Sequence, residues 1–275
     1  TALGPPLKIG SDHAMAKHIE NKILNEKRSP AAILGEIERE HMPFQTRICP
    51  ATLYSYIRKG VFGGITVKDL AEHGARKRTY RKIVAKSAPR GESIEKRPAE
   101  VDDRKTAGHW EMDTVKGKRG TKENLLVLTE RKSRGQLVRV MLDGTASSTV
   151  GEIDKIERQL GKDLFALVFK SITVDNGSEN ADYISLERSL YGGQRTKMYY
   201  CHPYSSYERG SNENQNRHIR RRVPKGTPIS DYAPEYISGV ERWLNANPRK
   251  IHGWRTAEQV FNSDFARVGV RLGEF

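Results

Sequence analysis

Short runs of alternating hydrophobic and polar residues occupy the second half of the chain and predict β-strands, whose successive side chains point to opposite faces. Five strands are expected, over residues 109–118, 124–134, 135–144, 170–177 and 196–201. Apolar residues at helical spacing predict helices over 147–163, 208–223 and 232–247. The last helix is expected to turn five residues inward: Tyr236, Ile237, Val240, Trp243 and Leu244.

The first part of the chain has helical periodicity instead. Ser29 and Pro30 form a helix start, since Ser caps free amides and Pro suits the first helical position. A second helix is expected from Pro50 to Gly60, with Leu53, Tyr54 and Ile57 on its apolar face. Two interpretations remain open for residues 11–65: a helix-turn-helix DNA-binding region or a plain helical hairpin with a solvated basic face. In the first, Arg58 and Lys59 bind nucleic acid.

A strongly basic stretch separates the helical first part of the chain from the second part with its strands, and residues 66–104 are predicted to form a linker. Pro89, Gly91 and Pro98 interrupt any regular element there. Seven cations follow one another without an intervening acid: Arg76, Lys77, Arg78, Arg81, Lys82, Lys86 and Arg90. Such a run binds phosphates and releases counterions, so Arg76, Lys77 and Arg78 are predicted to contact nucleic acid.

The order of the predicted elements favours a ribonuclease-H-like α/β domain over residues 105–262, with a mixed five-stranded sheet flanked by helices. Its first three strands are expected to be antiparallel, with the fourth parallel to the first after a right-handed crossover. Asp113 lies within the first strand and Asp175 ends the fourth, so the two can approach each other. Glu213, near the start of the helix over 208–223, is the candidate third carboxylate.

Three carboxylates at these positions suit two divalent cations. Mg²⁺ prefers carboxylate and water oxygens, and Mn²⁺ is expected to substitute for it. Each acid alone is more commonly structural, so the prediction that Asp113, Asp175 and Glu213 are catalytic metal ligands depends on their shared topological position. Asn216 and Arg217 lie three and four residues beyond Glu213 and hence on its helix face.

Residues near these acids have alternative roles. Asn216, Arg217, Arg220 and Arg221 are predicted to contact nucleic acid. Glu111 and His109 share the strand face of Asp113, as additional site residues or as ordinary structural ones. Asn176 and Gly177 are expected to shape the turn after Asp175, and Asn176 also to hydrogen-bond to a metal-bound water or to Asp175. Glu179 is expected to bind a cation or to cap the next helix.

Composition narrows the class of protein. The 275 residues carry a formal net charge of +14, a field that attracts polyanions such as nucleic acid. No apolar run approaches the ~20 residues that cross a bilayer, and no signal peptide is visible, so no membrane partner is expected. Two cysteines exclude a disulfide framework and fit a reducing cytoplasm. Because the chain begins at Thr1, we expect a fragment or a processed form.

Five motifs fall in order along the chain and resemble one family, the bacterial transposases of insertion-sequence family thirty. They are RGESIEKRPAEVDDR, GHWEMDTVKGK, ITVDNGSENAD, YYCHPYSSYERGSNENQNRHIRRRVPKGT and NPRKIHGW. The resemblance implies a retroviral-integrase-like DDE (Asp-Asp-Glu) catalytic domain whose triad falls on Asp113, Asp175 and Glu213. The chain departs from the family pattern at Asn180, where an aromatic residue is frequent, and at Tyr207 and Glu208, where Trp-Gln is frequent.

The resemblance implies DNA transposition: metal-dependent cleavage at the ends of an element, followed by strand transfer. The implied partners are double-stranded DNA, as terminal inverted repeats and as target, and a second copy of the chain in a homodimer or larger assembly. A further amino-terminal DNA-binding segment is usual in the family and is expected to be missing here. The alternatives are a ribonuclease-H-like nuclease without strand transfer and a domesticated, catalytically silent DNA-binding protein.

Overall fold

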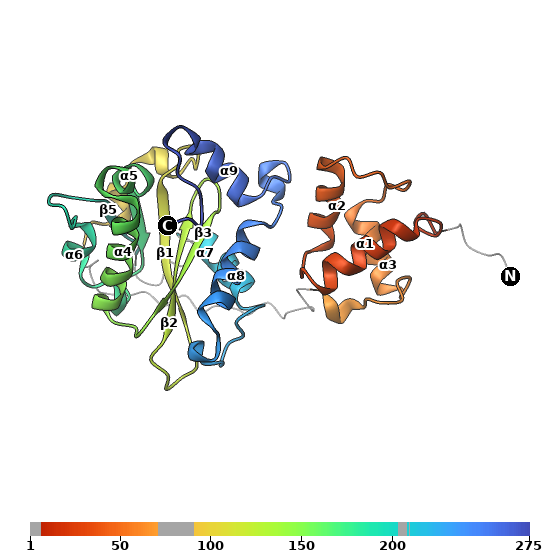
Figure 1. The fold of residues 1–275 in the computed structure, drawn as a ribbon, viewed down its shortest axis with the longest axis horizontal. Helices are drawn as coiled ribbons and strands as arrows, with labels where there is room; N and C mark the ends of the chain where they lie inside the picture. The colour runs from red at the N-terminus through yellow and green to blue at the C-terminus, as the bar shows by residue number, and fades with distance from the viewer. Residues whose placement is uncertain (1–6, 71–90, 203–207, 209) are drawn as a thin grey trace. The chain divides into compact units, whose positions relative to one another are not determined.

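The computed structural model describes residues 7–70, 91–202, 208 and 210–275, without the side chains of 210–213. The chain divides into two compact units (Figure 1). The described residues of 1–80 form the first unit together with 247–256, and those of 81–246 form the second together with 257–275.

The first unit is helical and has its own hydrophobic core. Its helices are α1 (His13–Leu24), α2 (Pro30–Arg39) and α3 (Pro50–Arg58), followed by a short turn, η1 (Val67–Asp69). The predicted start of α2 is confirmed, because the Ser29 side chain accepts a hydrogen bond from the Ala32 amide and Pro30 is the first helical residue. Ile19, Ile33 and Leu53 are fully buried where the three helices meet. Tyr54, expected on the apolar face, is 36% exposed, which corrects that prediction.

The second unit contains the sheet and the remaining long helices. The strands are β1 (His109–Lys116), β2 (Asn124–Glu130), β3 (Gln136–Met141), β4 (Ser171–Val174) and β5 (Lys197–Tyr200). The α-helices are α4 (Ala146–Leu160), α5 (Lys162–Val168), α6 (Tyr183–Glu187), α7 (Gly210–Ile219), α8 (Pro234–Asn245) and α9 (Ala257–Asp264). The 3₁₀ turns of this unit are η2 (Ile94–Lys96), η3 (Ala99–Val101), η4 (Ser178–Asn180), η6 (Ile229–Asp231) and η8 (Ala266–Val268). A further turn, η7 (Lys250–His252), belongs to the first unit.

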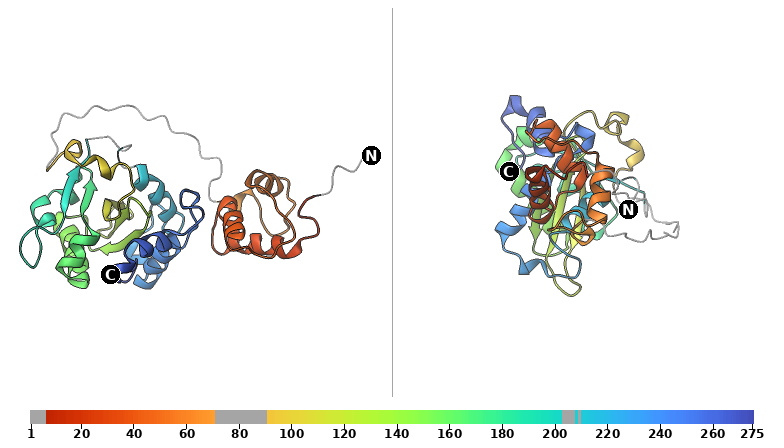
Figure 2. Two further views of the ribbon diagram at one scale, coloured as in Figure 1. Left: turned by 90° about the horizontal axis from the view of Figure 1, so that it is seen from above. Right: turned by 90° about the vertical axis from the view of Figure 1, so that its right-hand side faces the viewer.

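The sheet has the strand order β3-β2-β1-β4-β5, which is the order of a ribonuclease-H-like fold. β1, β2 and β3 are antiparallel neighbours, whereas β4 pairs in parallel with both β1 and β5. The predicted fold class is therefore confirmed. Figures 1 and 2 show helices on both faces of this sheet.

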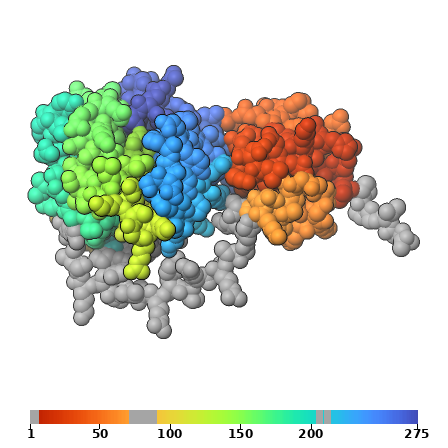
Figure 3. All heavy atoms as spheres, turned by 60° about the horizontal axis from the view of Figure 1, so that its bottom comes forward, coloured from red at the N-terminus to blue at the C-terminus, as the bar shows by residue number. Residues whose placement is uncertain are grey.

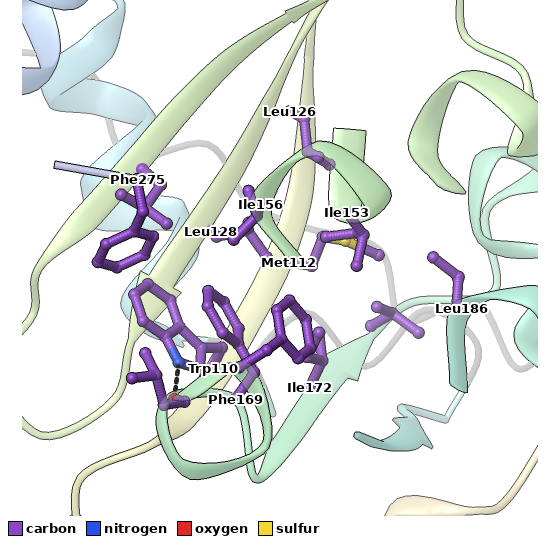
Figure 4. Packing of buried hydrophobic residues seen from close by; sticks show 14 of the residues in the cluster. Trp110, Met112, Leu126, Leu128, Ile153, Ile156, Phe169, Ile172, Leu186 and Phe275 are labelled. Atoms are coloured by element: carbon purple, nitrogen blue, oxygen red, sulfur yellow. Dashed lines mark hydrogen bonds between the residues drawn. The ribbon is translucent and has the colours of Figure 1, made fainter. Parts of the chain in front are cut away.

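One face of the sheet packs against α4 and α5. Trp110 and Met112 of β1 lie there with Phe165 and Phe169, and the Trp110 indole stacks on Phe169 at 4.6 Å between ring centroids. The indole Nε1 donates to the Val168 carbonyl at 2.7 Å (Figure 4). This satisfied aromatic core fixes the register of β1, because a slip of one residue would expose Trp110.

The opposite face of the sheet packs against α7 and α8. Val115 and Val127 of the sheet contact Ile219, Val240 and Leu244 from the helical layer. The turn after β1 lies beside η6 (Figure 3), where a Cβ at Gly117 would come within 3.2 Å of Ile229 Cγ1. Since side chains alternate along β1, this helical layer covers the face to which Asp113 belongs.

Two local predictions are wrong. The predicted helix over 147–163 is two helices, because Gly161 adopts a positive φ of 76° and ends α4 at Leu160. Tyr236 of α8 is 42% exposed rather than inward-facing; it stacks on Tyr232, and its hydroxyl donates to the Arg222 carbonyl at 2.9 Å.

Within the described part of the chain, no helix combines the length and the apolar character needed to span a bilayer.

Candidate active site

The register of two neighbouring parallel strands places two of the three predicted catalytic acids level with each other: Asp113 lies within β1, and Asp175 directly follows β4. β1 and β4 pair with Glu111 opposite Thr173. Carrying the same offset two residues further places Asp113 opposite Asp175, and paired residues of parallel strands share a face. Both carboxylates are partly exposed. The sheet thus brings together two acids that are remote in sequence.

Asp113 is oriented by two donors. Its Oδ1 accepts from the Thr114 amide at 2.9 Å, and its Oδ2 accepts from Asn216 Nδ2 at 2.6 Å. Asn216 belongs to α7, which packs against β1. Asn216 was predicted as a nucleic-acid contact, and the structure places its amide directly on a candidate catalytic carboxylate.

Asp175 is oriented within the turn that follows β4. Its Oδ1 accepts from the Gly177 amide and from Asn180 Nδ2, both at 3.0 Å. Asn176 donates instead to the Cys201 carbonyl at 2.7 Å, and so ties the turn to the end of β5. The side-chain amide that donates to the Asp175 carboxylate is therefore that of Asn180.

A layer of ionic contacts lies two residues before the acids on the same face of the sheet; it is buried at Glu111 and Arg131 and exposed at Asp102. Glu111 is fully buried and pairs with Arg131, at 2.5 Å between Oε1 and Nη1. Arg131 also donates to the Val101 carbonyl and to Asp102. Asp102 in turn pairs with Arg97, which donates to Thr173 Oγ1 at 2.9 Å. Glu111 is thus engaged as a structural partner, and this layer fastens the segment before β1 to both strands of the site.

His109 belongs to the same buried layer. Its Nδ1 lies 2.7 Å from Ser171 Oγ, and burial lowers the pKa of the imidazole. His109 therefore bridges β1 and β4 as a neutral structural residue, and Ser171 rather than Asp113 is its partner.

A second ionic contact lies on the approach to α7. His202 Nδ1 is 2.7 Å from Glu208 Oε1, and the His202 amide donates to Glu208 Oε2 at 2.9 Å. Glu95 lies 3.2 Å from Nε2 of the same ring. The hydrogen bond to Glu208 raises the pKa of His202. The negative charge that this chain carries at Glu208 is therefore met by an imidazole.

The third predicted acid, Glu213, belongs to the first turns of α7, and its side chain lies outside the described part of the structure. Its backbone position is three residues before Asn216, on neighbouring positions of the helix surface. Arg76, Lys77 and Arg78 also lie outside the described residues. Whether Glu213 completes the pair of aspartates stays a prediction.

The remaining cationic candidates differ in exposure. Arg58 and Lys59 are exposed at the end of α3, and Arg217 is exposed on α7, where its Nη2 donates to Asn214 Oδ1. Arg220 is half-buried: its Nη2 donates to the Lys116 carbonyl at 2.7 Å, and burial lowers its pKa. Arg221 is partly exposed. Arg220 thus has a structural contact in addition to its predicted one.

The residues present suit a hard divalent cation. Two carboxylates supply oxygen donors, and the Asn216 amide oxygen beside Asp113 is buried without a hydrogen-bond partner. Mg²⁺ is commonly held by one or two carboxylates and completes its shell with water. Among the described side chains, which exclude that of Glu213, no group of three acidic, His or Cys residues forms a complete metal site.

Sequence patterns could not reveal several of these contacts. Arg131 and Arg97 follow ordinary polar patterns, and their partners depend on tertiary contacts across 20 and 76 residues. Asn180 was signalled only by its departure from the family pattern.

Comparison with known proteins places the chain among transposases. It is 33% identical over 254 residues to the transposase for insertion sequence element IS4351 of Bacteroides fragilis, covering 90% of this chain and 73% of the relative. It is 36% identical over 181 residues to the IS1086 transposase of Cupriavidus metallidurans, covering 66% of this chain and 50% of the relative. Transposase InsI of IS30A from Escherichia coli is 31% identical, covering 88% of this chain and 63% of the relative.

The chain spans about half the length of the IS1086 relative and less than two thirds of InsI. No protein-family model matches it. The catalytic core domain of BIV integrase superposes on 59% of this chain and 99% of its own, with a TM-score of 0.40 and 18% identity. The extent of the IS4351 match is decisive for the family: the chain belongs to the transposases of insertion-sequence family thirty.

Proposed function

We propose that this chain catalyses DNA transposition, by metal-dependent cleavage of element ends and transfer of the freed strand into DNA. The observation that carries the proposal is the parallel pairing of β1 and β4, whose register places Asp113 level with Asp175, the residue directly after β4; each aspartate has an oxygen fixed by a side-chain amide. Two carboxylates arranged in this way bind cations against a phosphate. Membership in the transposase family supports the same chemistry.

Asp113, Asp175 and Glu213 are proposed to hold two Mg²⁺ ions, with Mn²⁺ as a substitute. When bound, such ions neutralise charge on the scissile phosphodiester and assist displacement of its leaving oxygen. The contribution of the protein is orientation: Asn216 and Asn180 hold the carboxylates in fixed directions, so little reorganisation is needed when DNA binds.

Double-stranded DNA is the proposed partner, as terminal inverted repeats and as target. The net charge of +14 favours a polyanion. The proposed contacts are Arg58 and Lys59 at the end of α3, Arg76, Lys77 and Arg78 in the linker, Asn216 and Arg217 on α7, and Arg220 and Arg221 directly after α7. Residues 11–65 form the proposed helix-turn-helix region, 66–104 the linker and 105–262 the catalytic domain. Pairing of two ends requires a homodimer or a larger assembly, acting at the bacterial nucleoid in the cytoplasm.

Cleavage of a terminal-repeat duplex by wild type and Asp175→Asn tests the proposal. Wild type should nick the end in Mg²⁺ or Mn²⁺, and the variant should bind the same DNA without nicking it, because a ligand is lost while the basic surface is kept. Equal nicking by both proteins would exclude the metal-ligand role.

A precut end distinguishes transposition from the alternatives. A transposase should join the exposed 3′-hydroxyl of that end to target DNA, whereas a ribonuclease-H-like nuclease would only hydrolyse. Binding with neither reaction would indicate a catalytically silent DNA-binding protein.

A further inference from the structure

Asn180 is built into the turn after β4 more firmly than an ordinary loop residue. It is 2% exposed and closes the short turn η4. Its side-chain Nδ2 lies 3.0 Å from Asp175 Oδ1 and 3.4 Å from the Asp175 carbonyl. One buried amide group therefore reaches both the side chain and the backbone of the same aspartate.

Asn180 is itself held from the neighbouring strand. The Tyr200 hydroxyl donates to the Asn180 carbonyl, and Tyr200, at the end of β5, is fully buried. Val174 and Tyr200 are paired residues of β4 and β5, so this tyrosine lies beside the last residue of β4, which directly precedes Asp175. This hydrogen bond holds the Asn180 backbone in place, so the side-chain amide keeps its position beside Asp175.

Tyr200 is in turn fixed by the segment that precedes β1. Its amide donates to the Glu92 carbonyl at 2.8 Å, and Ser93 bridges to it in parallel at the edge of the sheet. A Cβ at Gly91 would come within 2.6 Å of the Tyr200 ring, so Gly91 permits this close approach. A chain of three hydrogen bonds thus connects the sheet edge to Asp175: from Tyr200 to Glu92, from Tyr200 to Asn180, and from Asn180 to Asp175.

We propose that Asn180 is a positioning residue for Asp175, with Tyr200 as its support, and that the pair sets the metal affinity of the site. This inference rests on the proposed function, because it assigns Asp175 to a metal. Residues that hydrogen-bond to metal ligands restrict ligand orientation, and their loss costs about 10- to 100-fold in metal affinity or activity.

The alternative is that Asn180 only stabilises the turn. Both interpretations predict that Asn180→Leu, which keeps the approximate size and removes the amide, lowers the melting temperature. Only the positioning role predicts a change in the Mn²⁺ concentration that half-saturates the site. Thermal stabilisation of the DNA-free, 275-residue chain by MnCl₂ measures that concentration without catalysis.

Asn245→Leu is the matched control. Asn245 is also buried, and its amide exchanges two hydrogen bonds of 2.8 Å with the Gln136 backbone, on β3 and away from Asp175. It should destabilise the protein without changing the Mn²⁺ dependence. Asn180→Leu should raise the half-saturating concentration about 10- to 100-fold. Tyr200→Phe keeps the ring, removes only the hydroxyl and should raise that concentration by a smaller factor.

Wild-type half-saturation in both Asn180→Leu and Tyr200→Phe would overturn the positioning role. If Asn180→Leu does not fold, Tyr200→Phe alone decides between the two interpretations. A double-mutant cycle between Asn180→Leu and Asp175→Ala, measured without metal, tests the Asn180–Asp175 hydrogen bond independently. The shifts in urea midpoint of the two single variants should not add up to the shift of the double variant. Additive shifts would overturn the contact. If the mutant cycle gives non-additive shifts but MnCl₂ does not stabilise the wild-type protein, the Asn180–Asp175 contact is upheld. The proposed metal-dependent function would then be overturned instead.

Discussion

Asn216 on α7 donates a hydrogen bond of 2.6 Å to Oδ2 of Asp113 on β1, across 103 residues of sequence. The bond joins the helix that contains Glu213 to the strand that contains the first aspartate. The position of that helix relative to the sheet is therefore coupled to the orientation of a candidate catalytic carboxylate.

Replacing Asn216 with Leu should weaken the site without unfolding the protein. The Asp113 carboxylate loses a donor that orients it, so we expect half-maximal cleavage to need about 10- to 100-fold more Mn²⁺. A Mn²⁺ titration of cleavage on terminal-repeat DNA measures this. Asn214→Leu is the control, because Asn214 is exposed on the same helix and contacts only Arg217 among its described partners. An unchanged titration in Asn216→Leu would contradict the orienting role.

Replacing Arg131 with Met should strongly destabilise the second unit. Glu111 is fully buried and its partner guanidinium is 3% exposed, so the substitution leaves an uncompensated buried carboxylate. Breaking such a pair costs about 3–5 kcal/mol in the free energy of unfolding. Urea unfolding measures the loss. The double variant Arg131→Met, Glu111→Leu should recover part of it, because no buried charge remains; a double variant less stable than the single one would contradict this explanation.

His202 should make stability depend on pH. Its pKa is raised by the hydrogen bond to Glu208, so the folded protein binds the proton more tightly than the unfolded chain does. The stabilisation is therefore full below the unfolded value of about 6.5 and is lost as the pH rises through the raised folded value. The urea midpoint of wild type should exceed that of His202→Asn most at pH 5.5, and this difference should shrink by pH 9.

The same pH series on Glu208→Gln provides the control, because the carboxylate that raises the pKa is removed while the size is kept. The pH-dependent part of the difference should be much smaller in that background. A wild-type advantage over His202→Asn that is constant across the range would show that the imidazole contributes by packing alone.

Substituting Gly177 with Ala should disturb Asp175 directly. A Cβ at Gly177 would lie 2.7 Å from the Glu179 carboxylate and 2.9 Å from Asp175 Oδ1. The flexible Glu179 can move away, whereas the short Asp175 side chain must rotate off its two donors. We expect cleavage activity to fall by about tenfold or more while the melting temperature changes little. Loss of melting temperature in proportion to activity would indicate that the turn itself has been disrupted.

Much of the fold could be predicted from the chain because apolar and polar residues follow strand or helix periods along its elements. The strand that contains Asp113 alternates inward Trp110 and Met112 with the acids of the opposite face, and this alternation indicates both strand and register. The parallel pairing of β1 and β4, and hence the approach of Asp113 to Asp175, followed from element order alone. Local chemistry also located the start of α2 at Ser29 and Pro30.

The polar contacts of the site could not be predicted in the same way. Asn176 and Asn180 are both near Asp175 in sequence, and only the path of the turn decides which amide faces the carboxylate. Glu111 was ambiguous because its partner, Arg131, lies 20 residues away, directly after β2, and an ion pair has no sequence period. Tyr236 was misplaced because an amphipathic pattern does not distinguish a buried ring from one stacked at the rim of the helix.

Anomalous diffraction from crystals of the protein soaked in MnCl₂ tests the central claim most directly, because it locates the ions themselves. The account predicts Mn²⁺ peaks within about 2.0–2.3 Å of the carboxylate oxygens of Asp113 and Asp175, with the Glu213 carboxylate at the same site and the peaks lost in Asp175→Asn. Peaks located elsewhere, or a Glu213 side chain directed away from the two aspartates in the ion-bound crystal, would contradict it.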